Sequence, residues 1–167
     1  MAINIRLSGI ITDSIVDGPG LRYVIFTQGC PHHCYKCHNQ STWDYHAGYK
    51  EKISKIKKEI IANKLIQGIT LSGGEPFIQA RKCLTLAKFA KKHNLDIVIY
   101  SGYTYEELLA KNDKVINKLL ASCDYLIDGP FRYDLMDLNL KFRGSSNQRI
   151  IDLKATLLNK KIITKEL

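Results

Sequence analysis

Hydrophobic positions along the chain alternate between short β-rich runs and longer stretches with helical periodicity. A continuous apolar run bounded by turn residues is typical of a strand covered on both faces, and apolar residues three or four apart indicate an amphipathic helix. The runs predict strands at residues 3–7, 21–27, 68–72, 95–100, 123–127, 148–153 and 161–164. The periodic stretches predict helices at residues 51–65, 78–93, 105–120 (with a candidate break at 112–113) and, as a short one, 134–140.

The order of these elements predicts an α/β fold. A strand followed by a helix and another strand is the pattern of a parallel β/α unit with a right-handed crossover. A closed barrel of eight such units typically needs more than about 200 residues, whereas this chain has 167. We therefore expect an incomplete (β/α) barrel of about five or six units, formed by residues 1–167 as a single domain.

Composition indicates an ordinary globular protein, because hydrophobic residues make up 45% of the chain. No apolar run reaches the length that crosses a membrane, and residues 1–6 lack the apolar core of a signal peptide. We expect a cytoplasmic protein with no membrane partner. Five cysteines, an odd number, fit a reducing compartment in which thiols bind metals rather than form disulfides.

The chain carries a net charge of +9, from 25 basic and 16 acidic residues. Lysines are spread over the predicted helix faces at 50–58 and 88–92, which in the simplest interpretation makes a solvated surface. The alternative is electrostatic docking of an acidic protein partner. Nucleic acid is not an expected partner, because aromatic residues do not alternate with the basic ones and no nucleic-acid-reading motif is present.

Three cysteines lie within eight positions directly after the second predicted strand. Cys30, Cys34 and Cys37 have the spacing C-x3-C-x2-C, which lets one loop aim three sulfurs at a common centre. A cubane iron–sulfur cluster normally takes four thiolates, so three would leave one iron open to a non-protein ligand. The other interpretation is a structural zinc site with a nearby histidine as fourth ligand. Cys83 and Cys123 lie apart and are expected to be small buried hydrophobic residues.

A second polar motif, Gly73-Gly74-Glu75-Pro76, follows the predicted strand at 68–72. Two glycines let the backbone approach a ligand closely, and strand-end carbonyls with a carboxylate could accept hydrogen bonds from a ligand ammonium group. The simpler interpretation is a strand-to-helix turn with proline at the first helical position. Because the carboxyl ends of parallel strands meet at one edge, we expect this motif to lie near the cysteine loop.

Together, the three-cysteine loop and the Gly-Gly-Glu-Pro motif resemble the radical S-adenosylmethionine superfamily. The segment Asp-Gly-Pro-Gly-Leu-Arg at 17–22, followed by Gln-Gly-Cys at 28–30, resembles its glycyl-radical activating enzymes. Segments 100–104, 128–131 and 143–149 resemble the family of anaerobic ribonucleotide reductase activating proteins. The resemblance covers almost the whole chain, in order.

This resemblance implies the cofactors and the residues that hold them. Cys30, Cys34 and Cys37 would each bind an iron of a [4Fe-4S] cluster, whose fourth iron would chelate the methionine moiety of S-adenosylmethionine. The other implied cofactor contacts are Gly73, Gly74 and Glu75 toward the amino group, Lys36, Cys37 and His38 near the adenine, and Ser101 and Asp128 at strand ends.

The resemblance also implies a reaction and a partner. An external electron would reduce the cluster and cleave S-adenosylmethionine to methionine and a 5′-deoxyadenosyl radical. That radical would take a hydrogen from a glycine of anaerobic ribonucleoside-triphosphate reductase. The basic surface suits an acidic, flavodoxin-like electron donor. Two alternatives stay open: activation of another glycyl-radical enzyme and, from a different class, a structural zinc-binding interaction domain.

Overall fold

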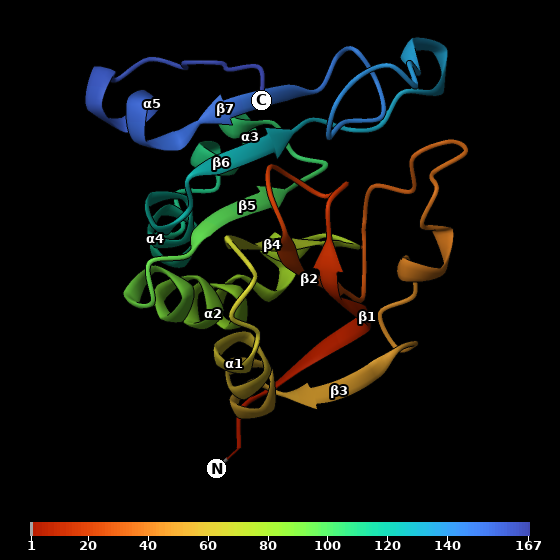
Figure 1. Ribbon diagram of the computed structural model, residues 1–167. Coiled ribbons are helices and arrows are strands. Elements are labelled where there is room, and N and C mark those ends of the chain that lie inside the picture. Colours follow the sequence, from red (N-terminus) through yellow and green to blue (C-terminus); the bar gives the residue numbers. More distant parts are fainter. Residues whose placement is uncertain (1) are drawn as a thin grey trace.

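One sheet of seven strands forms the frame of the protein (Figure 1). The computed structural model describes residues 2–167. The strands are β1 (Asn4–Ser14), β2 (Arg22–Thr27), β3 (Tyr49–Lys52), β4 (Gly68–Gly73), β5 (Asp96–Tyr100), β6 (Tyr125–Asp128) and β7 (Arg149–Asp152). Their order across the sheet is β3-β1-β2-β4-β5-β6-β7.

The middle of the sheet is parallel and its two margins are antiparallel. β2, β4, β5 and β6 pair in the parallel sense, whereas β1 and β3 extend one margin and β7 the other in the antiparallel sense. The predicted α/β class and the open, incomplete barrel are confirmed, because the sheet does not close on itself. The parallel strands number four, which is smaller than the five or six units expected, because the chain reverses direction at both margins.

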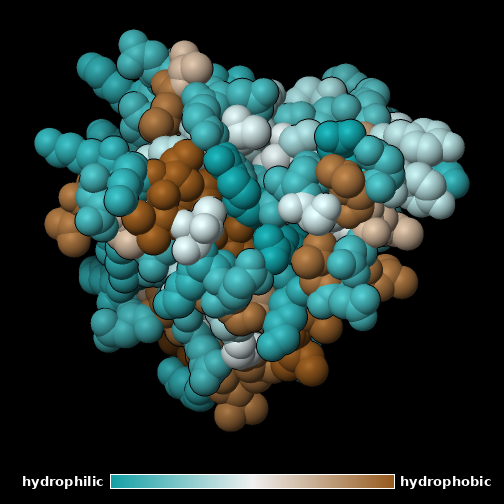
Figure 2. Space-filling model, turned by 90° about the horizontal axis from the view of Figure 1, so that it is seen from above, coloured by the Kyte–Doolittle hydropathy of each residue, from teal (hydrophilic) through white to brown (hydrophobic). Residues whose placement is uncertain are grey.

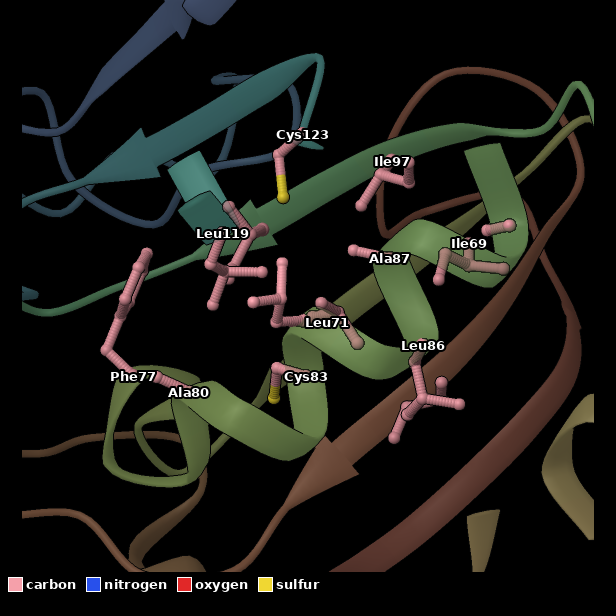
Figure 3. Packing of buried hydrophobic residues seen from close by; sticks show 14 of the residues in the cluster. Ile69, Leu71, Phe77, Ala80, Cys83, Leu86, Ala87, Ile97, Leu119 and Cys123 are labelled. Atoms are coloured by element: carbon pink, nitrogen blue, oxygen red, sulfur yellow. The ribbon is translucent and has the colours of Figure 1, made fainter. Parts of the chain in front are cut away.

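Helices cover one face of this sheet (Figure 1). They are α1 (Ile53–Ala62), α2 (Ala80–Lys92), α3 (Tyr105–Ala110), α4 (Lys114–Ser122) and α5 (Leu153–Asn159). Their apolar side chains pack with alternate residues of the strands in the main hydrophobic core. Cys83 and Cys123 lie in this packing with Leu71 and Leu119 (Figure 3) and are 0% and 1% exposed, which confirms the prediction that both are buried.

The opposite face of the sheet is the floor of a cleft. Because strand side chains alternate between faces, β5 sends Ile97 and Ile99 toward the helices, whereas Val98 and Tyr100 point to the other side. On β4 the same alternation places Ser72 on the side of Tyr100, and both residues line the cleft. Strand register therefore decides which side chains can reach a ligand at this end of the sheet.

The helix predicted at 105–120 is divided into α3 and α4. Asn112 has a left-handed φ of 47°, which ends the first helix. The side chain of Asp113 then accepts hydrogen bonds from the N–H groups of Val115 and Ile116 and begins the second. The candidate break at 112–113 is thus confirmed.

Two elements predicted near the carboxyl terminus are shorter than expected. Instead of a strand at 161–164, the structure has an isolated bridge between Thr164 and Ile151. Instead of a helix at 134–140, it has one 3-10 turn at Tyr133–Leu135. Residues 163–165 still pair with the edge strand β7, because the N–H of Asp152 donates to the carbonyl of Ile163 and the N–H of Lys165 to the carbonyl of Ile150, each at 2.9 Å.

The face of the molecule seen in Figure 2 carries mostly hydrophilic side chains, with separate hydrophobic patches. Large apolar side chains with high exposure include Leu138 at 85% and Leu158 at 84%. Among residues 2–167, no helix has both the length and the apolar character that crossing a membrane requires.

Candidate cofactor site at the ends of the parallel strands

The cysteine loop leaves the carboxyl end of β2, at the edge where β4, β5 and β6 also end. Main-chain hydrogen bonds fix the base of the loop: the N–H groups of Gly29 and Cys30 donate to the carbonyls of Thr42 and Trp43, at 2.8 and 3.2 Å. Farther along, the N–H group of Cys37 donates to the carbonyl of Cys34 at 3.0 Å, which makes a tight turn between these two residues. The loop is therefore held at its base and folded at its tip.

Cys30, Cys34 and Cys37 all line one cavity of about 150 Å³. Its remaining wall comes from the ends of the parallel strands and the segments that follow them, including Ser72, Gly73, Gly74, Ser101, Gly102 and Gly129. A wider cavity of about 420 Å³ adjoins it and shares Cys37, Ser72 and several other lining residues. The two form one cleft that opens from the cysteines toward the surface.

Burial acts on the thiols in the inner cavity. Cys30 is 8% exposed, and burial raises its pKa to about 11. Burial also raises the pKa of Cys34, and the main-chain N–H of Phe131 acts in the opposite direction. Both thiols therefore hold their protons at neutral pH, and a metal that binds them as thiolates must displace those protons.

Gly73 and Gly74 bring the end of β4 against the cysteine loop. A Cβ atom on Gly73, whose φ is 100°, would lie 2.4 Å from the main-chain nitrogen of Thr27. A Cβ atom on Gly74 would lie 2.3 Å from the carbonyl oxygen of Gly29. The N–H groups of Gly74 and Glu75 donate to the carbonyls of Thr27 and Gly29, each at 2.8 Å. Only residues without a side chain permit this close approach.

The carboxylate of Glu75 is fully buried and joins three segments. It accepts hydrogen bonds from the Ser101 hydroxyl and the Gly102 N–H beyond β5, and from the N–H of Phe77. Its Oε2 also lies 2.7 Å from Nε2 of His32 in the cysteine loop. Groups within the protein thus satisfy the hydrogen-bonding capacity of this carboxylate. The Gly73-Gly74-Glu75 segment therefore faces the cavity with main-chain atoms.

Ser101 and Asp128 differ in their access to the cleft. Ser101 lines the inner cavity, and its hydroxyl also accepts a hydrogen bond from the N–H of Tyr103 at 3.0 Å. Asp128 is 1% exposed and accepts hydrogen bonds from Arg149 and from the N–H of Tyr105. Two carboxylates, of Asp128 and Glu106, raise the pKa of Arg149. Asp128 is thus held by partners within the protein, beside Gly129, which lines the cavity.

Lys36 and His38 lie on the outer side of the cysteine loop. The Lys36 ammonium group lies 4.1 Å from the centre of the Tyr133 ring. His38 lines the outer cavity, and its ring is 5.2 Å from that of Phe131. Cys37, between them, lines both cavities, so its backbone lies where the two cavities adjoin.

A family model described as a 4Fe-4S single cluster domain matches residues 16–151. An anaerobic ribonucleoside-triphosphate reductase-activating protein from Salmonella typhi is 38% identical over 148 residues, which cover 84% of this chain and 94% of that protein. The chain belongs to this family of activating proteins. As a further relative, the pyruvate formate-lyase 1-activating enzyme of Escherichia coli (strain K12) is 29% identical over 171 residues, covering 97% of this chain and 66% of that enzyme.

A solved structure, QueE from Escherichia coli, overlaps 60% of this activating protein and 53% of its own chain. At 17% identity and a TM-score of 0.48, this likeness is too partial to support a functional conclusion. Family membership confirms the predicted class, a radical S-adenosylmethionine enzyme, and its cofactors, a [4Fe-4S] cluster and S-adenosylmethionine.

The residues of the activating protein fit such a cluster by donor type and position. Three thiols line one cavity, and Gly73, Gly74, Gly102 and Gly129, which carry no side chains, line it with them. As the side chains stand, no three metal-binding groups within residues 2–167 converge closely enough to hold a single ion. The fit therefore rests on the soft thiolate donors and on their shared cavity.

Trp43, which lines the inner cavity, carries little signal in the sequence of this activating protein. Phe131 and Gln148, from the segments 128–131 and 143–149 that carry the family resemblance, line both cavities. From the sequence alone, His32 is expected to be a surface or supporting residue rather than a catalyst, and its contact with the buried Glu75 is a supporting one. Gly102 permits this placement of the imidazole, because a Cβ atom there would lie 2.3 Å from the His32 ring.

Proposed function

We propose that this chain activates anaerobic ribonucleoside-triphosphate reductase by cleaving S-adenosylmethionine reductively at a [4Fe-4S] cluster. One observation carries the proposal: Cys30, Cys34 and Cys37 line a single cavity at the strand ends of a chain from this family. In this proposal the three thiolates bind three irons, and the fourth iron takes S-adenosylmethionine. When bound, these cofactors supply an electron and, by carbon–sulfur cleavage, a 5′-deoxyadenosyl radical.

The protein's own residues position the cofactors. Gly73 and Gly74 line the same cavity as the cysteines, and their main chain would receive the amino group of S-adenosylmethionine. Glu75 holds that segment and His32 in place through its hydrogen bonds. Ser101 lines the same cavity and would lie beside the cofactor. Asp128 would act through Arg149 and the neighbouring Gly129 rather than by a free carboxylate.

Lys36, Cys37 and His38 would border the adenine through the backbone at the entrance to the inner cavity. Cys37 lines both cavities, and His38 lines the outer one. The outer cavity, of about 420 Å³, would admit a glycine-bearing segment of the reductase toward the cofactor. Because the reacting radical must be kept from water, a docked protein would also close the cleft.

The remaining assignments belong to the same proposal. Residues 1–167 act as one domain, which the single seven-stranded sheet supports. The electron donor is an acidic, flavodoxin-like protein, which the net charge of +9 favours. The protein works in the cytoplasm, where reducing conditions suit its five free cysteines.

The test combines the protein with its cofactors and two candidate targets. The anaerobically reconstituted and reduced protein is mixed with S-adenosylmethionine and either anaerobic ribonucleoside-triphosphate reductase or pyruvate formate-lyase. We expect 5′-deoxyadenosine release, and a glycyl radical signal in electron paramagnetic resonance with the reductase alone. A glycyl radical signal with the lyase alone would instead identify the chain as an activating protein of another glycyl-radical enzyme. Stoichiometric zinc, with no cluster after incubation with iron and sulfide, would support the zinc-binding alternative.

A further inference from the structure

Two residues of the cysteine loop have left-handed backbone conformations although neither is glycine. His33 lies between the first two cysteines with a φ of 46°, and Lys36 lies between the last two with a φ of 55°. This region is unfavourable for most residues that carry a Cβ atom; asparagine, aspartate and histidine adopt it more often than lysine does. Such a conformation persists only where surrounding contacts determine it. Each spacer between the cysteines therefore contains one strained residue.

The first strained residue is held by a tryptophan outside the spacer. The His33 ring stacks on that of Trp43, with centroids 4.5 Å apart and planes inclined by 10°. Trp43 also accepts the main-chain hydrogen bond of Cys30 and lines the inner cavity. One residue thus fixes both the first cysteine and the left-handed turn that follows it.

The second strained residue is held from a distant part of the chain. The Lys36 ammonium group lies 4.1 Å from the centre of the Tyr133 ring, a cation–π contact. Tyr133 begins the 3-10 turn Tyr133–Leu135 that follows β6. Tyr35 also meets Tyr133, edge to face, with centroids 5.8 Å apart. A segment about a hundred residues away in sequence therefore contacts the tip of the cysteine loop.

The geometry points to Trp43 and Tyr133 as positioning residues that hold His33 and Lys36 in the left-handed conformation and so keep the three thiols on the cavity wall before the cluster is inserted. This inference rests on the proposed function only in taking Cys30, Cys34 and Cys37 as cluster ligands. The two aromatic residues act through the backbone of the spacers.

Glycine substitution tests this directly, because glycine adopts positive φ without strain. Cluster uptake from ferrous iron and sulfide is followed anaerobically by visible absorbance. We expect Tyr133→Ala and Trp43→Ala to slow uptake by roughly two- to fivefold. Lys36→Gly should restore the rate in the Tyr133→Ala background, and His33→Gly should restore it in the Trp43→Ala background. Tyr133→Phe and Trp43→Phe keep the aromatic contacts and should behave as the unaltered protein.

Two controls separate this role from general stability. Lys160 is also left-handed, with a φ of 54° at the end of α5, far from the cysteines in the fold. Lys160→Gly relieves comparable strain there and should not restore uptake in either alanine variant. Leu158→Ala, which truncates an 84% exposed side chain of the same helix, should leave uptake unchanged. Uptake unaffected by the alanine variants, or restored by Lys160→Gly as well as by the spacer glycines, would overturn the inference.

Hydrogen exchange of the metal-free protein gives a second readout that does not depend on any cluster. Main-chain amides of residues 32–38 should exchange faster in Tyr133→Ala than in Tyr133→Phe, with other regions unchanged. Equal exchange in the two variants would contradict the role of Tyr133. If the unaltered protein takes up no cluster at all, the proposed function fails, while this measurement still decides whether the aromatic contacts hold the loop.

Discussion

Nε2 of His32 lies 2.7 Å from Oε2 of the fully buried Glu75, which links the cysteine loop to the end of β4. Glu75 in turn accepts hydrogen bonds from Ser101 and Gly102 beyond β5. Three separate segments thus meet at one carboxylate beside the cysteine cavity. Since a buried carboxylate depends on these partners, the site and the stability of the fold are coupled at this residue.

Replacing Glu75 should be strongly destabilising. Glu75→Ala would leave the Gly102 and Phe77 N–H groups without their acceptor, and loss of one partner in a buried polar network typically lowers stability by about 3 kcal/mol or more. Urea unfolding of the metal-free protein measures the change. Glu166→Ala, at a residue whose side chain is 76% exposed and paired with Arg143, is the matched control and should change stability by less than about 1 kcal/mol. Equal losses in the two variants would contradict the network.

Gly74 should tolerate no side chain. A Cβ atom there would lie 2.3 Å from the carbonyl oxygen of Gly29, and backbone cannot move aside as a flexible side chain could. Gly74→Ala is expected to lower the free energy of unfolding by about 1–3 kcal/mol and to displace the cysteine loop from β4. Gly9→Ala serves as the control, since a Cβ atom on Gly9 would meet no heavy atom within 4 Å. Thermal unfolding of both variants, compared with the unaltered protein, decides the matter; a stable Gly74→Ala would refute it.

Local patterns predicted the parts of the fold that have a strong local signal. The run at 21–27 and the Gly-Gly-Glu-Pro motif became β2 and the end of β4, because their apolar runs and glycines determine the backbone directly. β3 was not predicted, since its four residues, Tyr49–Lys52, are mostly exposed and polar. They form a strand only because the backbone of β1 is available for pairing. α5 was also missed, because seven residues give too short a periodic pattern.

The site was predictable in composition but not in its internal contacts. The three cysteines were recognisable from spacing alone, and the structure brings them to one cavity. The contact of His32 with Glu75 spans 43 positions, and the contact of Lys36 with Tyr133 spans more than half of the chain. Neither pair lies within one helix or strand, so no periodicity could reveal it. Long-range side-chain contacts of this kind depend on the folded sheet that brings the segments together.

Removing one cysteine of the loop should abolish function without unfolding the protein. Cys34 is partly exposed on the cavity wall, so Cys34→Ala should change the free energy of unfolding of the metal-free protein by less than about 1 kcal/mol. With one thiolate fewer, we expect no S-adenosylmethionine cleavage, measured as 5′-deoxyadenosine. Cys83→Ala is the matched control: it lies in the core, should lower stability and should leave cleavage intact. Retained cleavage in Cys34→Ala would exclude that residue as a ligand.

The buried thiol of Cys83 should make the protein less stable in alkaline solution. Complete burial raises its pKa from 9.0 to about 12. Below pH 9 the thiol is neutral in both the folded and the unfolded chain, so its stabilising contribution is fully present. Between pH 9 and 12 the unfolded chain loses this proton whereas the folded chain keeps it, which favours unfolding by about 1 kcal/mol per pH unit.

Urea unfolding at several pH values measures that slope. Cys83→Ala should be less stable at pH 7, because a cavity forms in the core, and yet should lose less stability than the unaltered protein between pH 9 and 11. Tyr23 and Tyr100, whose pKa values burial also raises, contribute equally in both proteins. The difference between the slopes therefore reports Cys83 together with its effect on the buried Cys123, whose pKa burial and the neighbouring Cys83 raise. Parallel slopes would mean that Cys83 ionises as readily in the folded chain as in the unfolded one, and the tight packing around it would then have to open at high pH.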